Sequence, residues 1–493
     1  MMNSTPSSSS AVIKASGWRG AWFRLVAIGV GLAPFVVCEL TLRIGGWGRV
    51  SDAVDPFVGF AAVHPLFELS QDGQRHEIPD SRHSFFRPDS FSVEKPPNGF
   101  RIFCLGGSTV QGRPFSTETS FTSWLELSLR AADPSRAWEV VNCGGISYAS
   151  YRLRPILLEL LEHEPDLFVI YTGHNEFLED RIYRAVKRTP RWIVRTHGTL
   201  TWLRMYNVLR SWWVGSEKLT DRPVLPSDVD ALLDYKGGLE DYERDDGWRR
   251  DIREHFEFNL RQMIHFAGGA DVPVILVNPV SDLENTPPFK FAQGDGIAAA
   301  EREAFLRLWD EARSLDATPQ GRIEALRKAI AIDDRHAGVH FLLGRLYETR
   351  GDLKLAMSSY IRAKDEDICP LRMLEPMHEA VLQVAAETQA TLIDARQLFQ
   401  QWAGSVFPGE KWLVDHVHPT IAGHRRLAEH LVLHMEHLGL TNLATGWEGR
   451  RDVSYRVHLK GFEPDYYIRG RQRLDGLKRW SQGRALGVKS RGK

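Results

Sequence analysis

The chain has 493 residues, of which 43% are hydrophobic and 25% charged, and its formal net charge at pH 7 is -1. This is ordinary globular usage, and the length allows one large domain with additions or two to three domains. A net charge near zero argues against a nucleic-acid partner. The cysteines are too few and scattered for a disulfide framework or zinc site, so we expect no metal and no cofactor. They are Cys38, Cys104, Cys143 and Cys369.

The N-terminal part of the chain consists of a polar leader followed by an apolar segment. Residues 1–20 include a serine-rich stretch without an apolar period, which predicts a disordered cytoplasmic leader. Residues 21–43 are mostly apolar and approach the ~20 residues that cross a bilayer. A signal anchor, a cleaved signal peptide and a buried core helix are the three alternatives. The sequence shows no clean small-x-small cleavage site after the run, which favours the transmembrane anchor.

The basic residues around this segment predict its orientation. Lys14, Arg19 and Arg24 precede its apolar run at 25–38, whereas Arg43 and Arg49 follow that run. An excess of cations marks the cytoplasmic side of a membrane helix. We therefore expect a single-pass membrane protein that contacts the lipid bilayer through its N-terminal helix. The rest of the chain would lie on the extracytoplasmic (periplasmic) side.

The main domain is expected over residues 99–440, after a cap or linker region at 51–98. Short apolar runs alternate there with helical patterns, which implies right-handed crossovers and a parallel sheet. The expected strands are 101–105, 138–142, 166–172, 272–278 and 391–394. The expected helices are 121–132, 151–162, 251–266 and 421–438.

A first insertion, residues 180–254, interrupts the main domain. It interleaves tryptophans with arginines between Trp192 and Trp213. A helical lid whose tryptophans pack on the core, a membrane-interface helix and a single-strand nucleic-acid platform are the alternatives. The acidic stretch from Asp228 to Glu257 disfavours the nucleic-acid alternative.

A second insertion, residues 294–373, has small and large residues where a helix-turn-helix pair needs close approach. These residues are His340, Leu343, Gly344, Tyr347, Gly351, Ala356, Tyr360 and Ala363. They resemble the tetratricopeptide repeat, with His340 in place of the usual Trp, and residues 325–330 fit a preceding copy at the period of about 34 residues. The resemblance implies helices docked on the main domain. A groove for a peptide or protein partner and a purely structural insertion are both open.

The C-terminal segment, residues 441–493, is a basic tail rich in arginine and lysine. We interpret it as solvated and partly disordered. Contact with an anionic surface is the alternative interpretation.

A serine follows two glycines at the end of the first predicted strand, in Gly106-Gly107-Ser108. Open α/β folds bind ligands at the carboxyl ends of their parallel strands. A serine hydroxyl becomes a nucleophile beside a base that a third group orients. Asp415 and His418 are three residues apart, so their side chains can face the same way on one turn and fill both roles.

The choice of histidine is open from spacing alone. His416 lies between Asp415 and His418, and His424 follows. A metal site made from Asp415, His416 and His418 is a further alternative, which the lack of another ligand cluster disfavours.

Candidate oxyanion donors follow the second and third predicted strands. After Asn142, Gly144 and Gly145 offer backbone N–H groups, and Asn175 offers a side-chain amide within residues 173–176. Because the carboxyl ends of parallel strands meet at one edge, we expect these groups to lie near the serine.

The order Ser, Gly, Asn and Asp-x-x-His resembles the SGNH (GDSL-type) hydrolases, a family named for residues in four blocks. Gly107 stands where the usual motif has Asp, and alignment from Asn142 puts the family's oxyanion glycine at Ser147. The resemblance covers about residues 98–180, 270–285 and 390–438, and it implies an α/β fold: a three-layer α/β/α flavodoxin-like sandwich with a parallel sheet. Helical insertions and an N-terminal transmembrane helix are expected additions. The implied site residues are Ser108, His418 and Asp415 as the triad, with Asn175, Gly145 and Gly144 at the oxyanion hole.

We therefore expect a serine esterase that hydrolyses carboxylic esters or O-acyl groups, with an acyl ester or acetylated glycan as substrate. An O-acetyltransferase acting on a cell-surface polysaccharide is the first alternative, because a sugar hydroxyl could replace water in the same site. A tetratricopeptide scaffold protein with little activity is the second. The complete set of Ser, Asn and Asp-x-x-His argues against it.

Overall fold

The computed structural model describes most of the chain. The described residues are 17–45, 47, 62–179, 200, 203–214, 224–235 and 237–483. Contacts within the chain divide it into two units. One consists of Met1–Ala53 and Arg191–Asp221, and the other of Val54–Pro190 and Arg222–Lys493.

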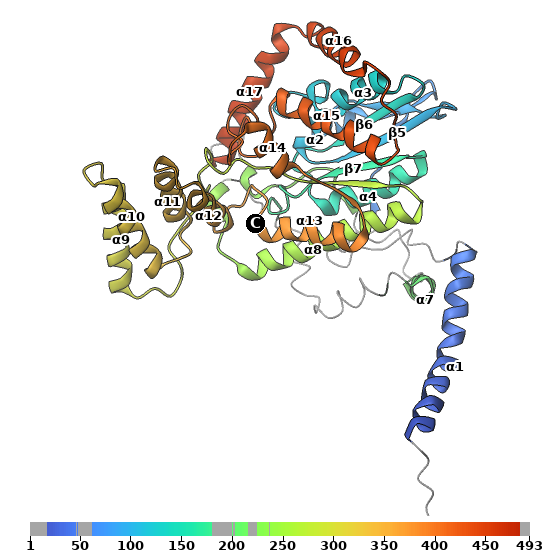
Figure 1. The fold of residues 1–493 in the computed structure, drawn as a ribbon, viewed down its shortest axis with the longest axis horizontal. Helices are drawn as coiled ribbons and strands as arrows, with labels where there is room; N and C mark the ends of the chain where they lie inside the picture. The colour runs from blue at the N-terminus through green and yellow to red at the C-terminus, as the bar shows by residue number, and fades with distance from the viewer. Residues whose placement is uncertain are drawn as a thin grey trace, which may run out of the picture. The chain divides into compact units, whose positions relative to one another are not determined.

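The larger unit is built on a sheet of five parallel strands (Figure 1). The strands are β5 (Gly99–Gly106), β6 (Ala137–Gly144), β7 (Leu167–Tyr171), β9 (Val274–Asn278) and β10 (Thr391–Asp394). Their spatial order, read from β6, is 2-1-3-4-5 in chain order, which is the flavodoxin-like arrangement. Every residue of β7 and β9 is buried, as continuous apolar runs of a parallel sheet require. The predicted parallel sheet is confirmed.

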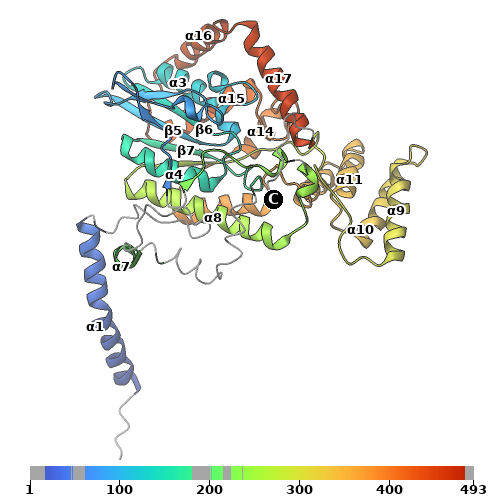
Figure 2. The ribbon, with the colours of Figure 1, turned by 180° about the vertical axis from the view of Figure 1, so that it is seen from behind.

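Helices cover both faces of the sheet, as Figures 1 and 2 show. One face carries α3 (Phe121–Ala132), α15 (Ile421–His437) and α16 (Trp447–Lys460), and α14 (Ala395–Ala403) adds Phe399 to the same core cluster. The other face carries α4 (Ser150–Leu160), α8 (Asp246–Gly269) and α13 (Glu375–Thr388). The predicted three-layer sandwich is therefore confirmed. Short 3-10 turns are η1 (Asp80–Arg82), η2 (Thr117–Thr119), η3 (Leu161–His163), η5 (Leu232–Asp234) and η6 (Gly238–Asp241).

The segment predicted as a cap or linker forms short strands beside the main sheet. These are β2 (Glu68–Leu69), β3 (Arg75–Glu77) and β4 (Ser90–Ser92) in one antiparallel sheet, and β1 (Ala62–Val63), which pairs with β8 (Val224–Leu225). The buried Arg101 guanidinium joins this region to β6, because it donates to Ser92 O at 2.7 Å and to Glu139 Oε2 at 2.8 Å. Its contacts place the segment against the edge of the parallel sheet.

The second insertion contains four helices in two successive pairs. They are α9 (Ala299–Arg313), α10 (Pro319–Ile332), α11 (Ala337–Thr349) and α12 (Leu353–Asp365). A Cβ at Gly344 of α11 would lie 2.7 Å from the Tyr360 ring of α12, so glycine permits the close approach of this pair. The predicted helical insertion is confirmed. Its correspondence to a tetratricopeptide repeat stays a prediction.

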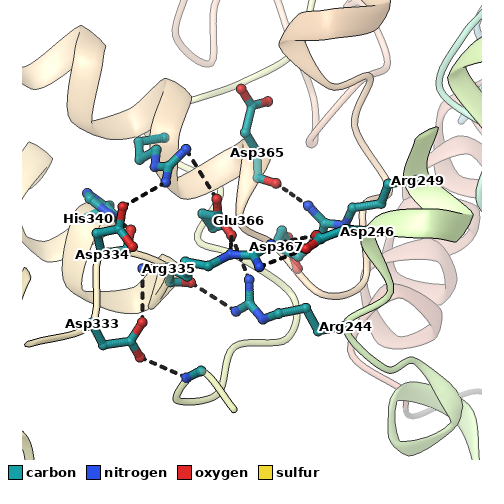
Figure 3. A network of polar contacts seen from close by, with 12 residues as sticks. Arg244, Asp246, Arg249, Asp333, Asp334, Arg335, His340, Asp365, Glu366 and Asp367 are labelled. Atoms are coloured by element: carbon teal, nitrogen blue, oxygen red, sulfur yellow. Dashed lines mark hydrogen bonds and ion pairs between the residues drawn. The ribbon is translucent and has the colours of Figure 1, made fainter. Parts of the chain in front are cut away.

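Charged side chains fasten this insertion to the start of α8 (Figure 3). Arg244 donates to Glu366 Oε2 at 2.6 Å, and Arg335 donates to the same oxygen at 3.1 Å. Arg335 also makes two hydrogen bonds to the Asp246 carboxylate, at 2.6 and 2.9 Å. The side chains of Arg244 and Glu366 are only 9% and 7% exposed. Neither charge can regain water without separation of the insertion from α8.

The basic tail differs from the expectation of a solvated segment. It contains α16 and α17 (Pro464–Ser481), and only residues 484–493 lie outside the described part. Tyr455 is 3% exposed and its hydroxyl bonds Ser128 Oγ at 2.5 Å. Tyr466 bonds Thr119 Oγ1 at 2.8 Å. The aromatic residues of the tail therefore pack on the domain while its basic residues face outward in large part.

The smaller unit contains α1 (Gly17–Ile44). Among the described residues, its stretch Trp22–Ile44 is the one helix long and apolar enough to cross a membrane. The predicted apolar helix is confirmed, whereas its role as anchor or signal sequence is not decided by length and composition. Residues 1–16 of the expected leader lie outside the described part.

The smaller unit also contains α7 (Arg204–Val214). The Glu39 carboxylate accepts hydrogen bonds from the N–H groups of Arg204 and Met205, each at 3.0 Å. A carboxylate at a helix N-terminus satisfies N–H groups that have no partner within the helix. The tryptophan-rich stretch around Trp192 lies outside the described residues, so its role as lid or membrane contact stays a prediction.

Replacement of Glu366 by alanine should destabilise the docked insertion, because Arg244 would remain buried without its counter-charge. Removal of one partner of a buried ion pair costs about 3–5 kcal/mol. We expect the free energy of unfolding, measured with denaturant, to fall by about that amount. The control is Glu303→Ala, because Glu303 pairs with Arg307 on the exposed surface of α9, where a pair contributes less than about 1 kcal/mol. Equal effects of the two substitutions would contradict this role of Glu366.

Candidate active site

Ser108 begins the short helix α2 (Ser108–Gln111) two residues after β5 ends. The backbone conformation of Gly107 does not require a glycine, because its φ of -87° is open to any residue. Space is what favours a glycine at this position. A Cβ at Gly107 would lie 2.4 Å from Asn175 Nδ2. The Asn175 amide therefore occupies the space that a side chain at this position would need.

His418 links Ser108 to Asp415 through hydrogen bonds. His418 Nε2 lies 2.7 Å from Ser108 Oγ, and Nδ1 lies 2.8 Å from Asp415 Oδ2. Asp415 Oδ1 also accepts from the N–H groups of Val417 and His418, at 2.9 and 2.8 Å. These local bonds form a turn that fixes the carboxylate against the imidazole. The structure thus brings together the three residues predicted from the motifs.

The charge of Asp415 orders this group of side chains. Burial disfavours the carboxylate, but the charges of His418 and His416 and the hydrogen bonds from His418 and Val417 outweigh burial, so the pKa of Asp415 lies well below its ordinary value. The carboxylate is therefore ionised at neutral pH and accepts the Nδ1 proton of His418. Nε2 then carries a lone pair towards Ser108, which is the tautomer that a general base needs.

The other two candidate histidines do not contact Ser108. His416 Nδ1 lies 3.8 Å from Asp415, and His424 Nδ1 accepts a backbone N–H of α3 at 3.3 Å. Burial lowers the pKa of His416 to about 4 and that of His424 to about 3. The structure therefore selects His418 from the three. Among the described residues, no group of three or more His, Cys, Asp and Glu side chains could hold a metal ion.

The N–H groups of Gly144 and Gly145 already donate within the protein. Gly144 donates to Asn142 Oδ1 and Gly145 to Gly106 O, both at 3.0 Å. The second bond extends the ladder between β5 and β6 by one step. These bonds leave neither N–H group available to a substrate oxygen. The structure therefore favours a neighbouring backbone N–H group after β6 as the oxyanion donor.

Ser147 is that neighbour. Its φ of 61° lies in the left-handed region, which favours glycine and explains why a family glycine would suit this position. No described residue accepts a hydrogen bond from its N–H, and Ser147 lines the same cavity as Ser108 and Asn175. Asn175 Nδ2 donates one hydrogen to Tyr148 O at 3.0 Å. The amide has a second hydrogen to donate.

Glu176 holds the segment that carries Asn175. Its carboxylate accepts from the Ser150 N–H at 2.8 Å and from the Ser150 hydroxyl at 2.9 Å, at the start of α4. Burial raises the pKa of Glu176 to about 7, and these two hydrogen bonds oppose the rise. His174 accepts the N–H of Met373 at 3.2 Å. Asn175 therefore lies between two residues tied to other elements.

Ser108 and His418 line a cavity of about 380 Å³. One side of this cavity comes from α17, a helix whose position near the site is not evident from the sequence. Aromatic residues recurring through a basic segment could have indicated a packed helix. A larger cavity of about 520 Å³ at the edge strand β6 includes neither Ser108 nor His418. Other residues that line the smaller cavity are Phe85, Arg113, Asp234, Arg473, Leu477 and Trp480.

No protein-family model and no curated protein matches this sequence. Solved structures with a similar fold include a lipase/acylhydrolase from Enterococcus faecalis. The sequences are 13% identical, the match covers 70% of this chain and 100% of that chain, and the TM-score is 0.33. Another is the acetylxylan esterase Axe2 from Geobacillus stearothermophilus. Here the sequences are 14% identical, the match covers 69% of this chain and 94% of that chain, and the TM-score is 0.32. Similarity this weak supports no conclusion about activity, which must come from the site itself.

Proposed function

We propose that this chain is a serine-dependent hydrolase of carboxylic esters or O-acyl groups, with acyl esters or acetylated glycans as substrates. The observation that carries the proposal is the hydrogen-bonded series from Ser108 through His418 to Asp415, with successive distances of 2.7 and 2.8 Å. A nucleophile, a base and an orienting carboxylate are the groups that acyl transfer needs. The adjoining cavity of about 380 Å³ has the size of a small-molecule site.

Each side chain has a defined role in the proposed reaction. Ser108 Oγ attacks the acyl carbon while His418 Nε2 takes its proton, and Asp415 stabilises the resulting imidazolium. His418 then protonates the departing alkoxide as the ester bond breaks, which leaves an acyl group on Ser108. Water deprotonated by His418 attacks this acyl group, and the carboxylic acid leaves as Ser108 regains its proton.

The oxyanion that develops in both steps needs donors already in place. The N–H groups of Ser108 and Ser147 have no described acceptor, and Asn175 has one amide hydrogen beyond its bond to Tyr148 O. All three residues line the cavity. We infer that these three donors form the oxyanion hole, with Ser147 in the role first expected of Gly144 or Gly145.

We also propose that α1 anchors the protein in a membrane, with the hydrolase on the extracytoplasmic side. The stretch Trp22–Ile44 has the length and composition of a single span. Lys14 and Arg19 before this stretch, and Arg24 at its N-terminal end, support a cytoplasmic N-terminus.

Ser108→Ala should abolish hydrolysis of short acyl esters, because the nucleophile is lost while the fold is retained. We expect kcat to fall by about 10⁴-fold or more, measured by ester hydrolysis and by labelling with a serine-directed fluorophosphonate. An unchanged rate would exclude Ser108 as nucleophile. No labelling and no hydrolysis by the unmodified chain would favour the scaffold alternative. Acyl transfer to an added glycan in preference to water would identify an O-acetyltransferase.

Asn175→Ala should lower kcat by about 10²–10³-fold with a smaller change in KM, because the lost donor acts on the oxyanion. The matched control is Asn98→Ala, since Asn98 is exposed and precedes β5 at the opposite edge of the sheet. Thermal unfolding of both variants separates loss of chemistry from loss of the bond to Tyr148 O. Equal kcat values for the two variants would rule out Asn175 as an oxyanion donor.

The anchor proposal predicts that the full chain stays in the membrane fraction after an alkaline wash. A variant with Val26, Val30 and Val37 replaced by lysine should leave that fraction, because charges within the span are costly. Protease added outside intact spheroplasts should digest the hydrolase domain. Removal of the N-terminal segment during export would instead establish a cleaved signal, and full protection from protease would reverse the orientation.

A further inference from the structure

Two arginines line one side of the catalytic cavity and a third lies near them, without a carboxylate in ion-pair contact with any of the three. Arg113 and Arg473 line the cavity together with Ser108. Arg87 lies close enough to both for its charge to act on each of them. No described carboxylate lies within 4.0 Å of any of the three guanidinium groups. These three arginines are half-buried, whereas the fully buried Arg101 and Arg152 are paired with Glu139 and Glu179.

The hydrogen-bonding capacity of these arginines is also largely unused. Arg473 Nη1 donates to Phe115 O at 2.5 Å and lies 3.4 Å from Pro114 O. The Nε groups of Arg87 and Arg113 are buried and bond no group. A guanidinium has five N–H donors in a fixed plane, and buried donors without acceptors are rare because each costs free energy. The site therefore lacks acceptors that a bound ligand could supply.

The electrostatics of the cavity agree with this geometry. Burial and the charges of Arg87 and Arg473 lower the pKa of Arg113 to about 10, with Asp415 opposing them, so Arg113 remains a cation at neutral pH. Asp234 is the one carboxylate that lines the cavity among the described residues, and it accepts a hydrogen bond from the Trp480 indole at 2.8 Å. Asp415 is engaged by His418. The cationic charge is therefore in excess beside the nucleophile.

We propose that the ester substrate carries an anionic oxygen group, a carboxylate or a phosphate, that Arg113 and Arg473 bind next to Ser108. Planar guanidinium groups match such oxyanions with paired hydrogen bonds. Binding of such a group explains why these arginines have no acidic partner, and why α17 places Arg473 beside the site. This inference rests on the proposed hydrolase function. It adds a substrate class that the triad itself does not specify.

The anionic group can lie on the acyl side or on the alcohol side of the ester, and matched substrates separate the two. For the acyl side, para-nitrophenyl hemisuccinate is compared with the similarly shaped neutral para-nitrophenyl isocaproate. For the alcohol side, acetate release from acetylated oligogalacturonate is compared with release from acetylated xylo-oligosaccharide. The full chain in detergent is assayed as wild type, Arg473→Gln and Arg471→Gln. Arg471 is an exposed arginine of the same helix that does not line the cavity.

We expect the wild type to prefer the anionic member of at least one pair by about tenfold or more in kcat/KM, the usual effect of a charge-assisted hydrogen bond. Arg473→Gln should reduce kcat/KM for that substrate about tenfold more than for its neutral partner, chiefly through KM. Arg471→Gln should leave both values within about twofold.

Two results would overturn the inference while the hydrolase function stands. One is Ser108-dependent hydrolysis of both pairs without preference for the anion. The other is an Arg473→Gln variant that loses equal activity towards both members of a pair, which would make Arg473 a support for Phe115 and its neighbours. Hydrolysis that persists in Ser108→Ala would instead overturn the proposed function, and hydrolysis of none of the four substrates would overturn both.

Discussion

The register of three parallel strands determines where the candidate site can form. Gly106, at the end of β5, pairs with Gly144 of β6 on one side and with Tyr171 of β7 on the other. The three strands therefore end together, and the turns after them present Ser108 and Asn175 at one edge. The same packing removes the side chain at position 106, since a Cβ there would lie 2.2 Å from Tyr171 O. A change of register would separate Ser108 from Asn175.

The base and its orienting carboxylate come to this edge as a unit. Asp415 accepts two backbone N–H groups of its own turn as well as the His418 imidazole, so their relative position is set locally. Only one long-range contact is then needed, between His418 and Ser108, which are 310 residues apart in the chain. Long insertions between the strands are tolerated because loop length adds little to the entropy of closure. The paired Arg244 and Glu366 hold the largest of them in place.

The charged groups of the domain fall into two kinds. Asp415 has more hydrogen-bond donors than it has oxygens, which stabilises its ionised form and preorganises the base. Arg113 and Arg473 have more donors than acceptors, so their charge is available to a ligand. Buried charges normally have partners because desolvation is costly. Arg113 and Arg473, which are half-buried beside Ser108 without a carboxylate in contact, are therefore the basis of the proposed anionic substrate.

The sequence by itself determined the fold class, and it indicated that Asp415 and His418 lie on one turn. Apolar runs and helical periods depend on local burial, so the predicted strands fall within two residues of the observed ends, and the predicted 121–132 helix coincides with α3. The Asp415 turn is likewise local. The tertiary structure decided between His416, His418 and His424, because only distance to Ser108 distinguishes them.

Two features of the candidate site were decided by the tertiary structure alone. They are the backbone N–H group available after β6 and the position of α17 beside the cavity. The N–H groups of Gly144 and Gly145 are occupied by contacts with Asn142 and with Gly106 on the neighbouring strand, which leaves Ser147. The amphipathic pattern of α17 is short and rich in charge. The residues that α17 contacts lie more than 200 positions earlier in the chain; for example, Trp480 and its partner Asp234 are 246 positions apart. Long-range packing of this kind leaves no period in the sequence, so only the folded chain places arginines beside the nucleophile.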